Sequence, residues 1–541
     1  MANTSENKSL EQQVGNTDSA TLDWLSLVAA PRLILGTGKN DVLNAQADGD
    51  IVSGLAGNDQ LSSAFNRTAL LGGNGDDTLT TKAVVSLQTD GPVTGLALQF
   101  GGIGNDTLDA TVTLQGGGFS QPWDTQQKAD VRLDGGAGND TINAIANLAG
   151  STGGTVALNT HVLGGGGNDT INVRADAKGA LGENYLTNIV DGGSGNDHIT
   201  AFGQSEFAAY HAYVTNQLFG GSGDDTINAT ARGWSNSTRD IVNELHGGSG
   251  NDVIRATNYT NSNSSHPTGL NQLWGDEGND TLVASHLARG NTFSEVTSYL
   301  DGGKGNDNLT ATTEATAQGG YVHALNHLEG GDGKDILTAD IQAGGGAGSG
   351  PSAFKGVPAY DVQNVLNGGV GDDQLTATLS ATPVSQVSLK VYDTSTVANH
   401  LDGGAGNDVL SATVAPGSLG SSFLDGGTGN DFLTVFGGSA NILHGGDGKD
   451  TLISGTGNDT MFGDAGADKF VFAAQNGHDT IHFEQGIDKI DFTSLAANNI
   501  DEFADLNIEV AGANSIVHLD ANNSLTIVGV NDLAAGDFWF A

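Results

Sequence analysis

The sequence predicts an all-β chain that is wound into a solenoid. A glycine-rich nonapeptide, GGxGxDxΦx with Φ a large aliphatic residue, recurs along almost the whole chain. Eighteen loops carry an aspartate at its sixth position, from Asp41 to Asp468. Between the loops, aliphatic and alanine residues alternate with polar ones, as in Leu108, Ala110 and Val112, which indicates strands with one buried face. Repeats of this kind bury a core only by stacking on their neighbours.

Each nonapeptide has the composition of a loop that holds a hard cation. Glycines allow positive φ and close approach of the backbone, so the turn can aim its carbonyl oxygens inward. The sixth-position aspartate adds a carboxylate, and oxygen-only ligation suits Ca²⁺, which takes roughly 6–8 oxygens. One Gly-Asn-Asp loop would be ordinary turn chemistry, but repetition predicts calcium binding. The expected metal residues are Asp59, Asp77, Asp106, Asp140, Asp169, Asp197, Asp225, Asp252, Asp280, Asp307, Asp335, Asp373, Asp408, Asp431, Asp450, Asp459 and Asp468, with the first glycines Gly135, Gly192, Gly220, Gly247, Gly302, Gly403 and Gly426.

The motif resembles the calcium-binding repeat of the repeats-in-toxin (RTX, haemolysin-type) family. The copy at Gly192–Ile199 reads GGSGNDHI, and similar copies start at Gly135, Gly302, Gly403 and Gly426. The resemblance covers about residues 32–541. It implies a right-handed parallel β-roll with enlarged central coils, a β-rich C-terminal cap, and Ca²⁺ bound between loops that stack on one edge.

The spacing of the loops divides the chain. Loops at Gly36, Gly54 and Gly72 lie 18 residues apart, and the central ones about 28 apart. We interpret the longer period as one enlarged coil that keeps the calcium loop on one edge and loses it on the other. Longer insertions such as Ala343–Pro358 are expected to protrude. The expected parts are a leader at 1–31, compact coils at 32–80, enlarged coils at 81–420, compact coils at 421–470 and a cap at 471–541.

Two columns of residues precede the loops. A leucine or valine lies two residues before the first glycine, and an asparagine often lies two residues further upstream, as at Asn216 and Asn243. The period of two places both columns in the interior. Stacked asparagines would form a hydrogen-bonded ladder at about 4.8 Å spacing; alternatively, each caps a local turn. The column comprises Asn188, Asn216, Asn243, Asn271, Asn326, Asn364 and Asn399.

The loop positions also predict how many ions are held. Seventeen of the loops are expected on one edge, which gives up to about sixteen sites between coils about 4.8 Å apart. The first loop has Lys39 where the motif has glycine, so Asp41 is the weakest candidate.

Composition limits the partners. The chain has 63 acidic and 20 basic residues, a formal net charge of −43, and no cysteine. Such a chain repels itself without bound cations, and its charge disfavours nucleic acid and anionic membrane surfaces. Disulfides and thiolate metal sites are excluded. We find no N-terminal secretory signal and no apolar segment of membrane-spanning length.

The C-terminus suggests how the chain is exported. Residues 471–541 resemble the β-rich segment that closes RTX rolls in type I-secreted proteins. The final Asp537-Phe538-Trp539-Phe540 resembles the uncleaved type I export signal. The resemblance implies secretion through type I machinery and an extracellular location, with folding driven by external Ca²⁺.

No catalytic module is recognisable. The sequence contains neither an HExxH zinc motif nor a GxSxG nucleophile elbow, so we expect no enzyme; a polysaccharide-modifying solenoid is the least favoured reading. The first expectation is a structural or adhesive protein of the cell surface, S-layer-like or in a biofilm matrix, whose partner is itself or a surface polysaccharide. The alternative is a carbohydrate- or host-binding effector that uses the variable edge. That alternative favours an aromatic stripe, and none is expected, because the residues before the loops are mixed: Phe100, Phe219, His246, Trp274 and Asp301.

Overall fold

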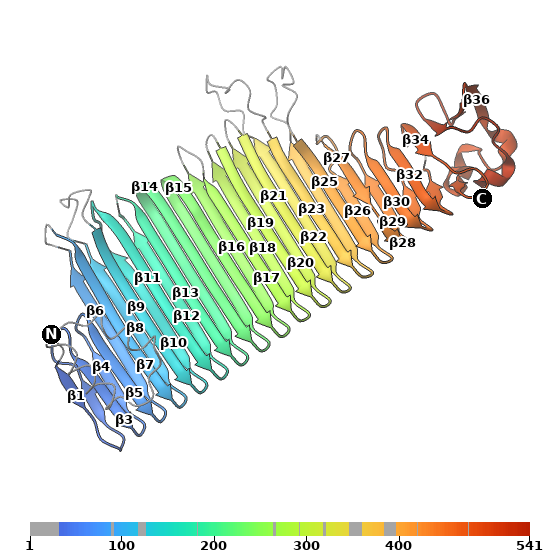
Figure 1. The fold of residues 1–541 in the computed structure, drawn as a ribbon. Coiled ribbons are helices and arrows are strands. Elements are labelled where there is room, and N and C mark those ends of the chain that lie inside the picture. Colours follow the sequence, from blue (N-terminus) through green and yellow to red (C-terminus); the bar gives the residue numbers. More distant parts are fainter. Residues whose placement is uncertain are drawn as a thin grey trace, which may run out of the picture. The chain divides into compact units, whose positions relative to one another are not determined.

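A computed structural model describes residues 32–87, 91–116, 126–180, 182–262, 267–290, 293–317, 321–345, 360–382, 396–418, 420–473 and 475–541. The expected leader at 1–31 and most of the expected insertion Ala343–Pro358 lie outside these ranges. The chain divides into two compact units, Met1–Glu277 and Gly278–Ala541. Each unit is a parallel β-solenoid (Figure 1), so the predicted all-β fold is confirmed.

The first unit consists of two stacks of parallel strands. Each coil contributes one strand after the glycine loop and one strand before the next loop, and each strand pairs in register with its counterpart one coil away. The strands after the loops are β2 (Val42–Asn44), β4 (Gln60–Ser63), β6 (Thr78–Ser86), β8 (Thr107–Gln115), β10 (Thr141–Ala149), β12 (Thr170–Lys178), the first parts of β14 (His198–Ser222) and β15 (Thr226–Ser249), and β16 (Val253–Ser262). The strands before the loops are β1 (Leu33–Leu35), β3 (Ile51–Ala56), β5 (Thr68–Asn74), β7 (Val93–Ile103), β9 (Gln126–Ala137), β11 (Thr155–Gly166), β13 (Asn184–Ser194), the last parts of β14 and β15, and β17 (Thr268–Glu277).

The second unit repeats this arrangement and then changes it at the C-terminus. One stack contains β18 (Thr281–Gly290), β20 (Asn308–Ala317), β22 (Ile336–Gly345), β24 (Gln374–Thr382), β26 (Val409–Val414), β29 (Phe432–Phe436), β31 (Thr451–Ile453), β33 (Lys469–Val471), β35 (Lys489–Asp491) and β39 (Phe538–Trp539). The other contains β19 (Phe293–Lys304), β21 (Tyr321–Asp332), β23 (Tyr360–Val370), β25 (Thr396–Ala405), β27 (Ser421–Asp425), β28 (Thr428–Gly429), β30 (Ile442–Gly448), β32 (Thr460–Gly466), β34 (His478–His482) and β38 (Ser524–Val528).

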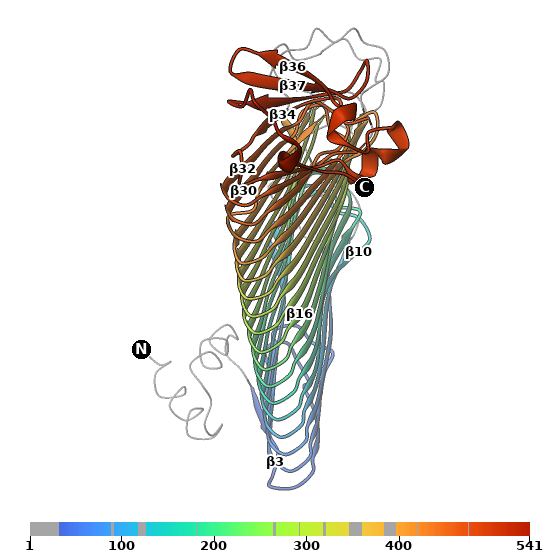
Figure 2. The same ribbon diagram turned by 90° about the vertical axis from the view of Figure 1, so that its right-hand side faces the viewer.

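A β-rich cap ends the second unit, as predicted. Strands β36 (Asn507–Ala511) and β37 (Asn514–His518) form an antiparallel hairpin that continues onto β38. Three short 3₁₀ helices lie beside it, η1 (Thr493–Asn498), η2 (Phe503–Asp505) and η3 (Ala535–Asp537) (Figure 2). Phe492 packs between Phe472 and Phe538, with ring centroids 5.9 and 5.5 Å away. This aromatic cluster closes the hydrophobic interior that the coils leave open.

The interior of each coil is thin because small and branched residues alternate with outward polar ones. In β8, Leu108, Ala110, Val112 and Leu114 are fully buried, whereas the residues between them are exposed or half-buried. Burying one such aliphatic side chain stabilises a fold by roughly 1.5–3 kcal/mol. Repetition of this pattern in every coil supplies the core and fixes which side of each strand faces outward.

A ladder of asparagines runs through the interior of each unit. In the first unit, Nδ2 of Asn188, Asn216 and Asn243 each donates to Oδ1 of the asparagine one coil further on, at 2.7, 2.7 and 2.9 Å. In the second unit, Asn326 donates to Asn364 at 3.1 Å and Asn364 to Asn399 at 2.9 Å. The ladder interpretation is thereby confirmed. Several amides also donate across the coil, as Asn243 does to the Thr257 carbonyl at 3.1 Å, which ties the two strand stacks together.

Candidate calcium loops

The sixth-position aspartates line one edge of each unit. The main-chain N–H of each aspartate donates to Oδ1 of the aspartate one coil further on, from Asp59→Asp77 to Asp225→Asp252 in the first unit, at 2.7 Å each. The same bond repeats from Asp280→Asp307 to Asp468→Asp488 in the second unit, at 2.7–3.0 Å. One carboxylate oxygen of each residue is therefore fixed, and the other points back into its own loop.

That second oxygen is the strongest indication that the loops suit a cation. Oδ2 is buried and makes no hydrogen bond in seven aspartates of each unit within the described residues: Asp59, Asp77, Asp106, Asp140, Asp169, Asp197 and Asp225, and Asp307, Asp335, Asp373, Asp408, Asp431, Asp450 and Asp468. Burying an unpaired carboxylate oxygen is costly, and a hard cation would remove that cost.

The first glycine of each loop leaves the space next to this oxygen open. A Cβ on Gly302 would lie 2.6 Å from Oδ2 of Asp307 and 2.6 Å from the carbonyl oxygen of Gly330 in the next coil. The same pair of oxygens flanks Gly403, formed by Asp408 and Gly426, again at 2.6 Å each. The loops thus bring a carboxylate and a carbonyl from successive coils together, and only glycine leaves room between them.

Electrostatics also favour a bound cation. Burial, reinforced by the neighbouring carboxylates Asp140 and Asp77, raises the pKa of Asp106 to about 7. Burial likewise raises the pKa of Asp225 to about 7, with Asp252 and Asp197 adding repulsion. Ionising such a column without a metal ion is unfavourable, whereas a divalent cation between loops stabilises the charged form.

The described residues contain no group of three or more His, Asp or Glu side chains close enough to hold one metal ion. In these loops the oxygens that lie next to the first glycine are one carboxylate oxygen of the same loop and one main-chain carbonyl oxygen of the next coil.

One expected ligand, Asp459, lies apart from the others. It belongs to the opposite edge, where its Oδ1 accepts the main-chain N–H of Asn441 at 2.9 Å and its own N–H donates to Asp479 at 2.9 Å. Its Oδ2 accepts the N–H of Gly455 at 3.2 Å. Both oxygens of Asp459 are thus hydrogen-bonded, unlike those of the main column.

Sequence reasoning missed three aspartates. Asp488 continues the main column after Asp468, and Asp479 continues the opposite edge after Asp459. Both follow a spacing of 20 residues and lack the double glycine, so the motif did not find them. The third, Asp50, occupies the sixth position of the degenerate nonapeptide at 45–53; the position of that residue in the repeat was the available signal.

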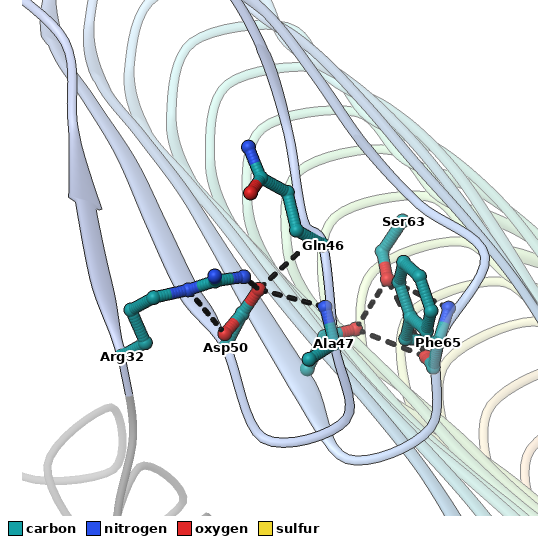
Figure 3. Close-up of polar contacts among 7 residues, drawn as sticks. Arg32, Gln46, Ala47, Asp50, Ser63 and Phe65 are labelled. Atoms are coloured by element: carbon teal, nitrogen blue, oxygen red, sulfur yellow. Dashed lines mark hydrogen bonds and ion pairs between the residues drawn. The ribbon is translucent and has the colours of Figure 1, made fainter.

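Asp50 is held by an internal cation. Nε and Nη2 of Arg32 donate to its two carboxylate oxygens at 3.1 and 2.5 Å, and the main-chain N–H groups of Gln46 and Ala47 donate at 2.7 and 2.9 Å (Figure 3). Although burial acts in the opposite direction, these hydrogen bonds hold the pKa of Asp50 below its ordinary value. The guanidinium thus neutralises a carboxylate at a loop position without a metal ion.

The expectation that no aromatic row precedes the loops is wrong. Phe219, His246 and Trp274 stack with ring centroids 5.1 and 4.2 Å apart. In the second unit, His444, Phe462 and His482 stack at 4.3 and 4.2 Å. Residues that are mixed in type become neighbours because equivalent positions of successive coils are in register. The rings cover one another's faces, so these rows strengthen coil stacking and do not form a flat platform for a sugar.

A parallel β-solenoid with repeated acidic edge loops is a cation-binding repeat protein. The family model described as RTX calcium-binding nonapeptide repeat matches residues 33–61, 129–144, 159–177, 184–205, 215–231, 242–258, 268–285, 395–413, 416–439 and 436–470. The chain is therefore an RTX repeat protein, and RTX repeats bind calcium. The resemblance found in the sequence is confirmed.

Other comparisons add little about function. No curated protein matches the chain significantly. Among solved structures, the extracellular lipase LipA from Serratia marcescens matches at 18% identity and a TM-score of 0.13. The match covers 56% of this chain and 40% of the lipase chain. Among the described residues, no helix has the length and apolar character needed to cross a membrane.

Proposed function

We propose that the protein is a secreted, extracellular RTX solenoid that folds when Ca²⁺ binds and serves as a structural or adhesive component of a cell surface, S-layer or biofilm matrix. The buried Oδ2 column carries the calcium part of the proposal. The carboxylates of the main column are the proposed ligands, joined by carbonyl oxygens of first glycines such as Gly330 and Gly426.

The number of proposed sites follows from the number of gaps between coils. Asp59 to Asp252 form eight consecutive loops in the first unit, and Asp280 to Asp468 form eight in the second. Each unit therefore offers about seven gaps between its own loops. Asp459, which was expected as a ligand but lies outside the main column, is a weaker candidate, because hydrogen bonds already occupy both of its oxygens.

The proposed structural role is supported by how the described residues are distributed between the coils and the cap. Almost every described residue belongs to the coils or to the cap, and we assign no catalytic residues. Export through type I machinery, directed by residues 537–541, belongs to the same proposal. Outside the cell, abundant Ca²⁺ would neutralise the aspartate column, and its binding free energy would become folding free energy.

Size-exclusion chromatography with light scattering, from chelated buffer to about 10 mM Ca²⁺, tests the proposal, with Mg²⁺ as the control because it demands octahedral geometry and keeps its waters. We expect compaction with Ca²⁺ and not with Mg²⁺. Growth in mass would support a self-assembling surface component, and compaction at constant mass an adhesin. A chain with the same radius in Ca²⁺ and in chelator would refute the calcium-folding proposal.

A further inference from the structure

A cluster of cationic and aromatic side chains interrupts the acidic surface of the first unit. It lies on the outward face of β12, β14, β15 and β16, and we call it the arginine–aromatic face. Within 170–178, 198–206, 226–234 and 253–262, the parts of these strands that belong to one stack, basic residues outnumber acidic ones. The basic residues are Arg174, Lys178, Arg232 and Arg255, and the acidic ones are Asp176 and Glu206. The face is therefore net positive in a chain of net charge −43. Its other members are Phe202, Trp234 and Tyr259.

The aromatic rings hold the guanidinium groups in place. The Arg232 guanidinium carbon lies 4.6 Å from the ring centroid of Tyr259 and 5.5 Å from that of Phe202. The Arg174 guanidinium lies 4.8 Å from the same Phe202 ring. A guanidinium that stacks through its plane keeps its N–H groups along its edges for hydrogen bonds. The order along the face is thus cation, ring, cation, ring.

Two of these cations are not neutralised within the chain. Oδ2 of Asp176 forms ion pairs with Nη2 of Arg174, at 2.5 Å, and with Nζ of Lys178, at 3.8 Å. Among the ion pairs of the described residues, none involves Arg232 or Arg255, and both side chains are exposed. Side chains that avoid carboxylates in so acidic a protein are available for an external anion.

We propose that the arginine–aromatic face binds an acidic polysaccharide, one that carries carboxylate or sulfate groups. Arg174 and Arg232 lie two coils apart, which is about 10 Å across the strands. Arg255 faces Asn228, roughly 13 Å along the strand direction from the position opposite Arg232, so an extended polyanion that runs obliquely across the strands meets these cations in turn. Guanidinium groups bind carboxylate or sulfate through two parallel hydrogen bonds. Trp234, 46% exposed, presents apolar ring surface beside the charges, which suits the apolar side of a pyranose.

The test uses the full chain at saturating Ca²⁺ and about 0.1 M NaCl, since charge contacts are screened within about 10 Å at that ionic strength. Binding of dextran sulfate and of hyaluronate is measured by titration calorimetry, with neutral dextran as the uncharged probe. The variant is Arg232→Gln/Arg255→Gln. The matched control is Arg289→Gln, an exposed arginine of the second unit whose guanidinium lies 3.7 Å from Glu314.

We expect the wild type to bind at least one acidic polymer and not to bind neutral dextran. The double variant should bind that polymer at least tenfold more weakly, whereas Arg289→Gln should change the affinity less than twofold. The preferred probe distinguishes sulfate from carboxylate. Equal binding by the double variant and the control would overturn the proposal, as would no binding of either polymer by the wild type. Growth in mass without polymer that the double variant abolishes would also overturn it, in favour of a second copy as the partner.

This inference rests on the proposed function in one respect: Ca²⁺ must fold the coils that carry the arginine–aromatic face. Far-UV circular dichroism in Ca²⁺ establishes folding of each variant independently of binding. If the double variant does not fold, the single change Arg255→Gln, at a residue exposed on β16, replaces it. A folded chain that ignores acidic polymers refutes the inference and leaves calcium-dependent folding intact.

Discussion

The main-chain N–H of Asp197 donates to Oδ1 of Asp225, one coil further on, at 2.7 Å. The bond gives each carboxylate two separate tasks. Oδ1 ties neighbouring coils together, and Oδ2 remains buried inside the loop, where a cation is expected. Changes that affect charge and changes that affect the hydrogen bond can therefore be separated.

Asp225→Asn should raise the Ca²⁺ concentration needed for folding several-fold, because the amide keeps an acceptor oxygen for Asp197 but removes the charge. Calcium titration followed by far-UV circular dichroism measures the midpoint. Asp224→Asn is the matched control, since the adjacent Asp224 is exposed and its Oδ1 accepts from the main chain and side chain of Asn251. Equal midpoints for the two variants would remove Asp225 from the ligands.

Gly164→Ala should impair folding in Ca²⁺ far more than Gly166→Ala in the same loop. A Cβ on Gly164 would lie 2.6 Å from Oδ2 of Asp169 and would collide with the carbonyl oxygen of Gly192. A Cβ on Gly166 would meet only Oγ of Ser194, at 3.4 Å. The calcium midpoint and the melting temperature are the measurements. If both variants behave like the wild type, the space beside Gly164 has no role in the loop.

Asn243→Ala should destabilise the calcium-loaded chain by roughly 1–3 kcal/mol, because it removes the interior hydrogen bonds with Asn216, Asn271 and the Thr257 carbonyl and deprives the Asn216 amide of its acceptor. Thermal unfolding at fixed Ca²⁺ measures the effect. Asn228→Ala, at an outward position of β15, is the control and should change little. An unchanged melting temperature for Asn243→Ala would count against the ladder as a stabilising element.

The metal-free chain should be more folded at pH 5 than at pH 8. Burial raises the pKa of Asp335 and Asp408 to about 7 in the folded state, above the ordinary value of 3.8. Protonation therefore favours the folded state, fully so below about pH 4, and this contribution disappears as the pH rises through about 7.

Far-UV circular dichroism in chelator across this range tests the pH dependence. The same series in saturating Ca²⁺ is the control, since the metal ion keeps the carboxylates ionised and should flatten the response between pH 6 and 8. Greater folding of the metal-free chain at pH 8 would contradict the assignment of these buried carboxylates.

The repeat made much of this structure predictable. Asp197 and Asn243 each occupy a fixed place in a period, so their alignment with residues in neighbouring coils follows from spacing alone. Asp479 and Asp488 were not predicted, because their loops keep the aspartate and lack the double glycine that marks the other loops. Position in the coil, rather than the motif, brings them into the columns.

Contacts that depend on residue type were harder to foresee. Arg32 lies 18 residues before Asp50, and nothing in the motif indicates that a guanidinium replaces a metal ion there. Stacking of His246 on Trp274 depends on equal coil lengths as well as on ring type. Such pairings require the three-dimensional register, which small differences in insertion length decide.

The aspartate bonds also give each stack a chemical direction. The main-chain N–H groups from Asp59 to Asp225 and from Asp280 to Asp468 all donate to the coil that follows in the chain. An end without a cap would therefore present carboxylate oxygens on one side and amide hydrogens on the other, each complementary to the opposite end of a second molecule. Uncapped units would then polymerise head to tail into fibres. The hairpin β36–β37 pairs antiparallel with β38. It therefore covers the edge at which a second molecule would add.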